Sequence, residues 1–219
     1  MTVTIKHHLD DALLLAYSTG NLPEAFSLTV AAHISMCDEC RARLGAFDTV
    51  GGALIDESDV AALADDSFEA TLARIGDMDN GVAARPASVV KKKSALPAPL
   101  HDYVGGDIDA INWKPVGLGV KQAILPTEKD ATARLLFIPA GVAVPDHGHH
   151  GTELTLVLKG AYSDEHDRFS RGDIEIANEE MDHTPVADIG EDCICLTAAD
   201  ARLKFRSFLP RLAQPFFRI

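Results

Sequence analysis

Basic residues are scarce in this sequence. Lys and Arg number 20 against 33 Asp and Glu, which gives a formal net charge of −13 over 219 residues. Nucleic-acid backbones and anionic lipid headgroups attract surfaces that are rich in Lys and Arg. The charge therefore argues against direct binding to nucleic acid or to a membrane. It permits a basic partner, such as a protein that itself binds nucleic acid, although excess charge also serves solubility alone.

Long apolar runs are also missing. No segment approaches the roughly 20 apolar residues that span a bilayer. Near the start, Asp10 and Asp11 precede the apolar run Ala12–Leu15, which is the wrong order for a secretory signal. We therefore expect a cytoplasmic protein. The composition, 47% hydrophobic and 24% charged, is that of a folded chain, and its length allows one large domain or two small ones.

Cysteine is rare, and the four residues form two close pairs. In a chain expected to be cytoplasmic, such pairs are typical of metal or redox sites rather than of a disulfide framework. Cys193 and Cys195 stand two apart in a predicted strand, so they face the same side of it. Core packing is the favoured interpretation of this pair, and a redox role is the alternative.

The pattern of apolar residues changes along the chain. Helical spacing runs through residues 1–77, with stripes in residues 9–17, 26–37, 40–54 and 68–75. Residues 78–101 contain three consecutive lysines and three prolines, and predict a flexible linker. From about residue 102, short apolar or alternating runs between Gly and Pro predict strands. The expected fold class is α+β with two domains: an all-α domain (1–77), the linker (78–101) and an all-β sandwich or barrel (102–219).

The first candidate metal site is the motif His33-x3-Cys37-x2-Cys40. On one helix, spacings of four and seven place the three side chains in a narrow stripe. Thiolate and imidazole ligands favour tetrahedral Zn²⁺, and either His7 or His8 is a candidate for the fourth ligand. The alternative is a helix with two buried thiols and a core histidine. A domain this small gains much of its stability from a metal, so we expect structural zinc.

The second candidate site lies in the predicted strands. His147 and His149 point to one face of an extended strand, and Glu153 opens a strand whose Leu residues at 154, 156 and 158 form its opposite face. His183 follows downstream. Three imidazoles and a carboxylate can bind Zn, Fe, Mn or Ni, so the expected cofactor is Zn²⁺ or another divalent transition metal. The alternative is a surface loop rich in His and Gly.

The segment from Gly141 to Gly160 reads G-x5-H-x-H-x3-E-x6-G, and resembles the first motif of the cupin family at every fixed position. Gly172 and His183 keep the spacing of the second cupin motif, although its intervening Pro and Gly are replaced by Asn178 and Glu180. This resemblance implies a cupin barrel. It also implies that His147, His149, Glu153 and His183 are the metal ligands.

The whole chain resembles ChrR-type zinc anti-sigma factors, which join an N-terminal zinc-binding anti-sigma domain to a C-terminal cupin. The resemblance includes both motifs, the opening His-His-x-x-Asp-Ala-Leu and the closing Ser-Phe-Leu-Pro-Arg-Leu. It implies that His8, His33, Cys37 and Cys40 bind zinc. It further implies that the helical domain sequesters an extracytoplasmic-function-type sigma factor, and that the cupin is needed for release under singlet oxygen or organic peroxide.

The charge distribution agrees with such a partner. Residues 1–77 carry four basic and thirteen acidic side chains, and a sigma factor presents basic surface to DNA. The competing interpretation is a cupin metalloenzyme, a dioxygenase or an isomerase, with a fused zinc module. A metal-storage or metal-sensing protein without a sigma partner is a third possibility. A stoichiometric sigma factor in affinity capture, or turnover of a small molecule, distinguishes between them.

Overall fold

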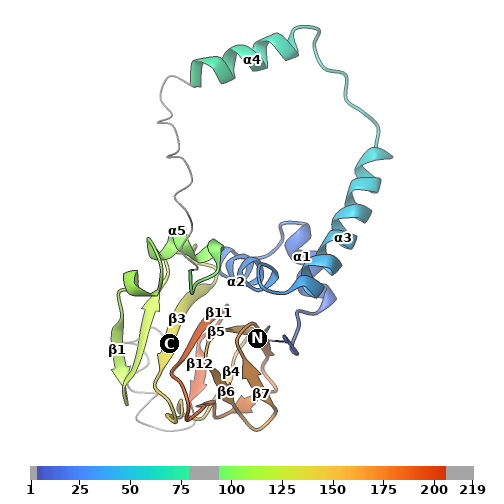
Figure 1. The fold of residues 1–219 in the computed structure, drawn as a ribbon. Coiled ribbons are helices and arrows are strands. Elements are labelled where there is room, and N and C mark those ends of the chain that lie inside the picture. The colour runs from blue at the N-terminus through green and yellow to red at the C-terminus, as the bar shows by residue number, and fades with distance from the viewer. Residues whose placement is uncertain (1–3, 79–93, 206–219) are drawn as a thin grey trace. The chain divides into compact units, whose positions relative to one another are not determined.

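A computed structural model describes residues 4–78 and 94–205 of the chain (Figure 1). Packing divides the chain into two compact units, one made of residues 1–48 and 94–219 and the other of residues 49–93. This division differs from the boundaries that the sequence predicts, because the first helices pack against the strands. Among the helices of the described residues, none combines the length and apolar character that crossing a bilayer requires.

The four predicted helical segments are present as α1 (Asp11–Ser18), α2 (Glu24–Ile34), α3 (Asp38–Asp56) and α4 (Ser67–Met78). The Asp10 carboxylate begins α1 by accepting the backbone N–H of Leu13 at 2.7 Å. One expectation is wrong: His33, Cys37 and Cys40 do not share a helix. α2 ends at Ile34, and Cys37 lies in the turn before α3. Its thiol accepts the backbone N–H of Cys40 at 3.4 Å, so it replaces a helical bond at the start of α3.

Twelve strands follow in the described C-terminal residues, and every pairing between them is antiparallel. A six-stranded sheet has the order β1-β2-β3-β11-β5-β8, and two three-stranded sheets have the orders β10-β6-β7 and β12-β4-β9. The all-β character predicted for this region is confirmed. The strands are β1 (Lys114–Gly117), β2 (Val120–Ile124), β3 (Thr132–Ile138), β4 (His147–His149), β5 (Glu153–Lys159), β6 (Ala161–Ser163), β7 (Arg168–Ser170), β8 (Ile174–Ala177), β9 (Asp182–His183), β10 (Val186–Ala187), β11 (Cys193–Ala199) and β12 (Leu203–Phe205).

Alternation along the strands separates two cores. On β5, the predicted stripe of Leu154, Leu156 and Leu158 belongs to a core shared with the helices. Val157 faces the other way, into a core within the β-domain that also contains Cys193 and Cys195. These two thiols are free and buried, 3.5 Å apart, which confirms core packing for the pair. The six-stranded sheet is therefore apolar on both faces, one of which the helices cover.

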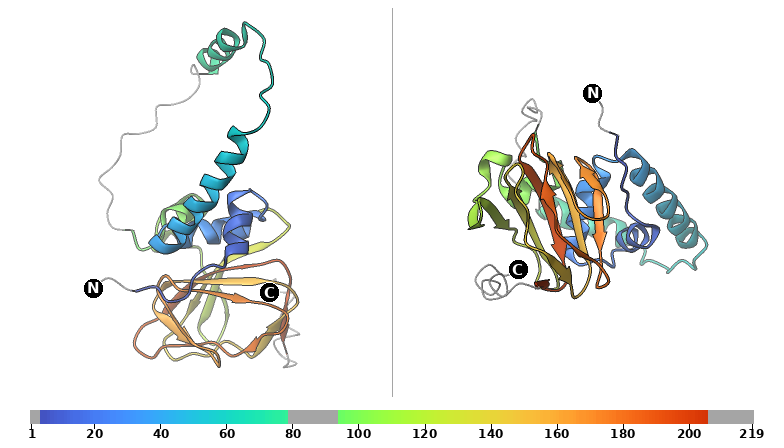
Figure 2. Two further views of the ribbon diagram at one scale, coloured as in Figure 1. Left: turned by 90° about the vertical axis from the view of Figure 1, so that its right-hand side faces the viewer. Right: turned by 90° about the horizontal axis from the view of Figure 1, so that it is seen from below.

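Helix α2 covers this sheet. Most of its residues are buried, and it contacts β11, β3 and β5 as well as α1 (Figure 2). A helix that is apolar on most of its circumference needs partners on several sides. The buried residues of α2 are Ala25, Phe26, Leu28, Thr29, Val30, Ala32 and His33.

Part of the predicted linker is ordered structure. Residues 79–93 lie outside the described residues, but the prediction is wrong for residues 94–101. They contain a 3₁₀ helix, η1 (Ala98–Leu100), and lead into α5 (His101–Val104), which is followed by η2 (Ile108–Ala110). Leu96 and Leu100 are 3% and 0% exposed, and the Asp107 carboxylate accepts the backbone N–H groups of Ala95 and Leu96 at 3.0 Å each. Burial of Leu96 and Leu100, four residues apart, thus keeps this segment ordered although its composition is rich in proline.

Two candidate metal centres

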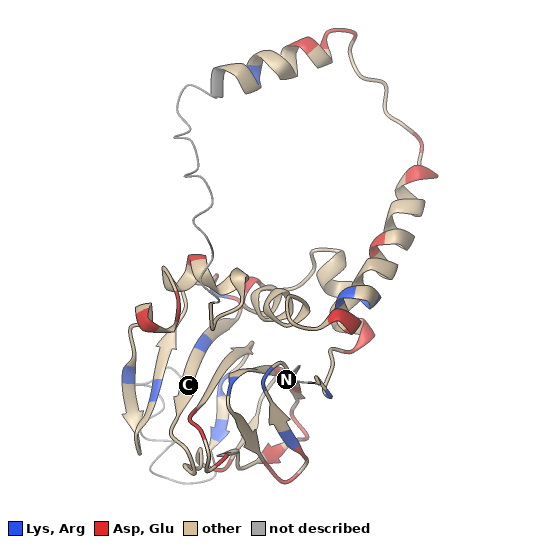
Figure 3. Ribbon diagram, viewed as in Figure 1, with Lys and Arg blue, Asp and Glu red and all other residues tan. Residues whose placement is uncertain are grey.

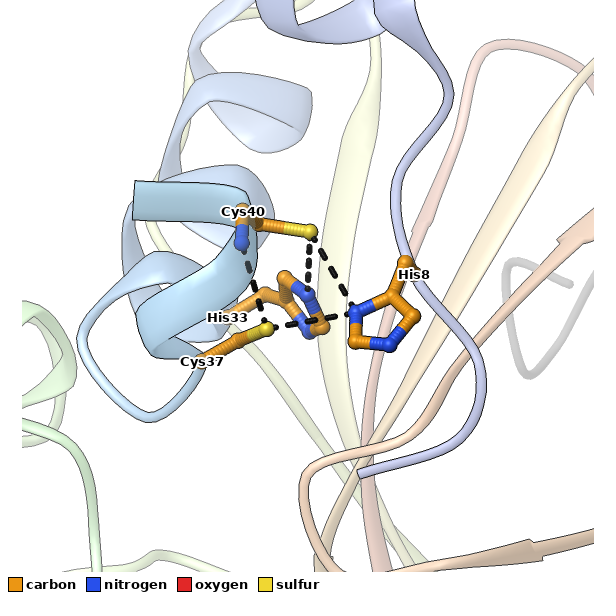
Figure 4. A group of neighbouring side chains, drawn as sticks. All are labelled: His8, His33, Cys37 and Cys40. Carbon is orange, nitrogen blue, oxygen red and sulfur yellow. Dashed lines mark hydrogen bonds between the residues drawn. The ribbon is translucent and has the colours of Figure 1, made fainter. Parts of the chain in front are cut away.

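The first centre assembles at the junction of three elements. His8 lies on the segment that precedes α1, His33 on the last turn of α2, Cys37 in the following turn and Cys40 on the first turn of α3 (Figure 4). One ligand atom from each residue lies within 4.8 Å of all the others. His33 and both cysteines are buried. On a single helix, His33, Cys37 and Cys40 would be spread over two turns. The break between α2 and α3 brings their side chains together around one point.

The spacing of these atoms fits tetrahedral zinc. The Nδ1 atom of His8 lies 3.3 Å from the Sγ atom of Cys37 and 3.6 Å from that of Cys40. The Nε2 atom of His33 lies 3.3 Å from the Sγ atom of Cys40. Zinc–nitrogen bonds of about 2.1 Å and zinc–sulfur bonds of about 2.3 Å make the edges of a tetrahedron about 3.6 Å long. A Cys₂His₂ donor set with these separations can hold a structural zinc ion.

Both imidazoles have their second nitrogen occupied. The Nδ1 atom of His33 lies 3.0 Å from the carbonyl oxygen of Gly172, so it carries the proton and leaves Nε2 free for a metal. The Nε2 atom of His8 lies 3.4 Å from a Glu39 carboxylate oxygen, which leaves Nδ1 free. Burial lowers the pKa of His33 to about 4 and raises the pKa of the Cys40 thiol to about 11. Without a metal these two groups are thus neutral, and a bound cation would favour the Cys40 thiolate.

His7, the other candidate for the fourth ligand, points elsewhere. Its Nε2 atom lies 3.1 Å from an Asp167 carboxylate oxygen, and its ring contacts Phe169 with a centroid distance of 4.4 Å. It does not belong to the cluster of ligand atoms that contains His8. Of the two candidates, His8 is therefore the one that lies with His33, Cys37 and Cys40, and its role as the fourth ligand stays a prediction.

The second centre contains His147 and His149 on β4 and His183 on β9, with His147 and His183 directly paired across the strands. The Nε2 atom of His183 lies 3.2 Å from that of His147 and 3.4 Å from that of His149. Ligands at about 2.1 Å from a metal are separated by about 3.0 Å in an octahedral site and by about 3.4 Å in a tetrahedral one. The three imidazoles therefore present one face of a metal site of either geometry.

Hydrogen bonds orient the imidazoles of His147 and His183. The Nδ1 atom of His147 lies 2.8 Å from the carbonyl oxygen of Pro145, and that of His183 lies 2.9 Å from Asp164 and 3.2 Å from Glu175. Burial lowers the pKa of His147 and of His149 to about 4. Burial also opposes a charge on His183, but the hydrogen bonds and charges of Glu175 and Asp164 outweigh it and raise the pKa to about 9.

Glu153 opens a strand, as predicted, but lies outside the group of converging histidine nitrogens. It lies at the start of β5, where a carboxylate oxygen accepts a hydrogen bond from the Thr155 hydroxyl at 3.2 Å. The described group of converging ligand atoms contains the three histidines and not Glu153. Its side chain lines the cavity that His147 and His183 also line, and burial raises its pKa to about 7. Its role as a fourth ligand stays a prediction.

The carboxylates that support His183 are absent from the sequence prediction. Asp164 and Glu175 both contact its Nδ1 atom, and the Tyr162 hydroxyl donates to Glu175 at 2.5 Å. Glu175 stands between Ile174 and Ile176 on a buried strand. This position is the one signal of the contact in the sequence, because a charged residue inside a buried apolar strand requires a hydrogen-bonding or charged partner.

A cavity of about 330 Å³ adjoins the second centre. Most of its lining is apolar, and His147, Glu153, Glu175 and His183 supply polar groups to it. Because three protein imidazoles leave positions open on a metal ion, a ligand from this cavity can reach it.

Comparisons with known proteins give the family. Residues 101–201 match the model of the ChrR cupin-like domain. Over 217 residues the chain is 58% identical to the anti-sigma-E factor ChrR of Cereibacter sphaeroides, covering 99% of this chain and 100% of that one. The fold matches the crystal structure of Rhodobacter sphaeroides SigE in complex with the anti-sigma ChrR, with a TM-score of 0.79, 54% identity, and coverage of 90% of this chain and 99% of that one. The chain therefore belongs to the ChrR family of anti-sigma factors.

Proposed function

We propose that this chain is a cytoplasmic anti-sigma factor that sequesters an extracytoplasmic-function-type sigma factor and releases it under singlet oxygen or organic peroxide. The observation that carries the proposal is the full-length likeness to ChrR, which has been crystallised with SigE. The likeness covers the helical residues as well as the cupin. If the cupin were an enzyme with a fused zinc module, the likeness to ChrR would not need to extend over both the helices and the cupin.

An exposed apolar surface supports a protein partner. In the unit of residues 49–93, helix α4 presents Phe68, Leu72 and Ile75 at spacings of four and three, and these side chains are 68%, 51% and 58% exposed. A monomer rarely leaves such a stripe in contact with water. The same unit also exposes Val50, Leu54, Ile55, Val60 and Leu63. We infer that these eight residues form the sigma-docking surface.

The charge of this region fits the same partner. Acidic residues occur along α3 and α4, with few basic ones among them (Figure 3). A sigma factor carries basic surface for promoter DNA, and an acidic helical segment can occupy it. Complementary charge would speed the encounter, and the apolar stripe would supply most of the affinity.

We assign different roles to the two centres. Zinc on His8, His33, Cys37 and Cys40 would hold the helices in the arrangement that binds sigma. Zinc or another divalent transition metal on His147, His149 and His183, with Glu153 as the proposed fourth ligand, would act in release. The open positions that face the cavity suit a centre whose ligands change under stress.

Binding to a purified sigma factor tests the first half of the proposal. Phe68→Ala with Leu72→Ala should weaken the complex by about 30-fold or more, since buried anchors of an interface contribute about 2 kcal/mol or more. Ile189→Ala is the matched control, because it removes an exposed apolar side chain from the cupin domain. A sigma factor that binds the double variant as tightly as the parent would disprove this docking surface. Residues 1–77 contain the zinc ligands and the stripe, so this fragment should also inhibit, but more weakly than the full chain because it lacks the sheet that covers α2.

A sigma-dependent reporter tests the second half. We expect His147→Ala with Glu153→Ala to inhibit sigma normally but to fail to release it under singlet oxygen. If oxidation of Cys37 and Cys40 is the signal instead, release should proceed as in the parent. Turnover of a small molecule by the purified chain, without any bound sigma factor, would favour the cupin metalloenzyme.

A further inference from the structure

The turn between β7 and β8 of the cupin domain reaches the zinc cluster. The carbonyl oxygen of Gly172 in this turn accepts a hydrogen bond from the Nδ1–H group of His33, and both groups are buried. Without this acceptor, either nitrogen of the imidazole could carry the proton. The cupin carbonyl therefore determines which nitrogen of His33 faces the metal.

The next residue of the turn, Asp173, holds the segment that carries His8. Its side chain is 0% exposed. One carboxylate oxygen accepts the backbone N–H groups of Lys6 at 2.6 Å and His7 at 3.0 Å. The other accepts the backbone N–H and the hydroxyl of Ser170, at 2.8 Å each. Asp173 thus fixes the backbone immediately before His8 to the cupin turn.

Further contacts reinforce this attachment. The backbone N–H of Ile174 donates to the carbonyl oxygen of His7 at 3.3 Å. The side chain of Ile5 lies against Gly172, whose φ is +94°, and its nearest atom is 2.7 Å from where a Cβ atom would stand. A glycine is therefore required here both by its backbone conformation and by the close approach of Ile5.

We propose that the cupin turn of residues 170–173 is a positioning element of the N-terminal zinc centre. Asp173 places His8, and Gly172 orients His33, so two of the four ligands depend on a domain that contributes no ligand. The inference rests on the proposal that this cluster binds zinc. It predicts that a substitution in the cupin, away from every metal ligand, weakens zinc binding.

The test substitutes Asp173 in the full-length chain and measures Co²⁺ affinity by competition with a chelator. The thiolate-to-cobalt absorption reports this centre alone, because the cupin site has no thiolate among its proposed ligands. Asp173→Ala should lower the affinity about 10- to 100-fold, as the loss of a partner that orients a metal ligand does. It should also change the cobalt spectrum, since His8 would no longer be held in place.

Two further variants separate positioning from general stability. Asp200→Ala removes another cupin carboxylate that accepts a backbone N–H, that of Thr152 at 2.9 Å, and should bind Co²⁺ like the parent. Asp173→Asn keeps one carbonyl oxygen for Lys6 and His7, and should show an intermediate loss even if Asp173→Ala does not fold. Folded Asp173 variants with the parent's affinity and spectrum would overturn the inference, whatever their melting temperature. A parent chain that gives no thiolate–cobalt absorption would overturn the zinc proposal itself.

Discussion

Helix α2 provides a direct test of whether the first helices and the cupin unfold as one body. Leu28 is 5% exposed and lies in the core that α2 shares with the six-stranded sheet. Replacing a buried Leu by Ala costs about 2.7–5.0 kcal/mol, because the transfer energy of the lost methyl groups adds to the cost of a cavity. For a domain of roughly 150–250 residues, each kcal/mol lowers Tm by about 2–4 °C. We therefore expect Leu28→Ala to lower Tm by roughly 5–20 °C.

Two probes in different parts of the chain make this prediction decisive. The only tryptophan, Trp113, contacts Phe137 in the cupin domain with a centroid distance of 5.9 Å, so its fluorescence reports the strands. In a background with His147→Ala and Glu153→Ala, which removes two proposed cupin ligands, a zinc-binding dye reports the N-terminal centre at a fixed total zinc concentration. Because the helices and the sheet share one core, both transitions should coincide and shift together in Leu28→Ala.

The control and the refuting result follow from the same melts. Leu72→Ala makes the same chemical change on α4, where the side chain is 51% exposed, and should leave both transitions within about 0.5 kcal/mol of the parent. If Leu28→Ala shifts zinc release and leaves the Trp113 transition unchanged, the helices and the cupin are independent domains, and the common core does not act as one cooperative unit.

Three other substitutions test separate contacts. Cys37→Ser should abolish zinc retention, measured by metal analysis after dialysis, and with it sigma binding, since a thiolate is lost from the tetrahedral set. Glu24→Gln tests pH dependence. The hydrogen bond from the Tyr103 hydroxyl lowers the pKa of Glu24, so the ionised carboxylate stabilises the fold fully above the ordinary pKa near 4.5. This stabilisation is lost as the pH falls through the lowered pKa. The Gln variant should therefore lose less stability than the parent on acidification below pH 4.5 in urea melts. Gly172→Ala should be destabilised and release zinc faster in a stopped-flow chelator assay, because a side chain there meets Ile5 and a positive φ.

Much of the fold follows from local patterns in the sequence. The alternation of Leu154, Leu156 and Leu158 correctly predicts which face of β5 is apolar, since the period of a strand is fixed at two. The packing of α2 on that face does not follow from any such pattern. Periodicity shows that a surface is apolar but does not show what covers it. The burial of Leu96 and Leu100 was likewise not predictable, because the proline-rich composition of residues 94–101 does not show what these side chains pack against.

The candidate sites show the same limit. The spacings of His and Cys point to six of the eight proposed ligands, which lie in the two converging groups, because ligand chemistry needs few residue types. Spacing left open whether His7 or His8 joins the first group. The helix break between His33 and Cys40 was not predictable from spacing, since residues 34–39 contain neither Gly nor Pro. Asp164 and Glu175 contact His183, and contacts of this kind leave no spacing in the sequence.

The attachment of the N-terminal segment to the cupin turn also determines the order in which the protein is assembled during synthesis. His33 and Gly172 are 139 residues apart, and Lys6 and Asp173 are 167 apart. At roughly 5–20 residues per second, a ribosome needs about 7–28 s to make the residues between His33 and Gly172. For most of that interval all four zinc ligands have been made, while the cupin groups that orient His33 and hold the segment of His8 do not yet exist. The first residues of the chain thus take their final place only after its cupin half has been made.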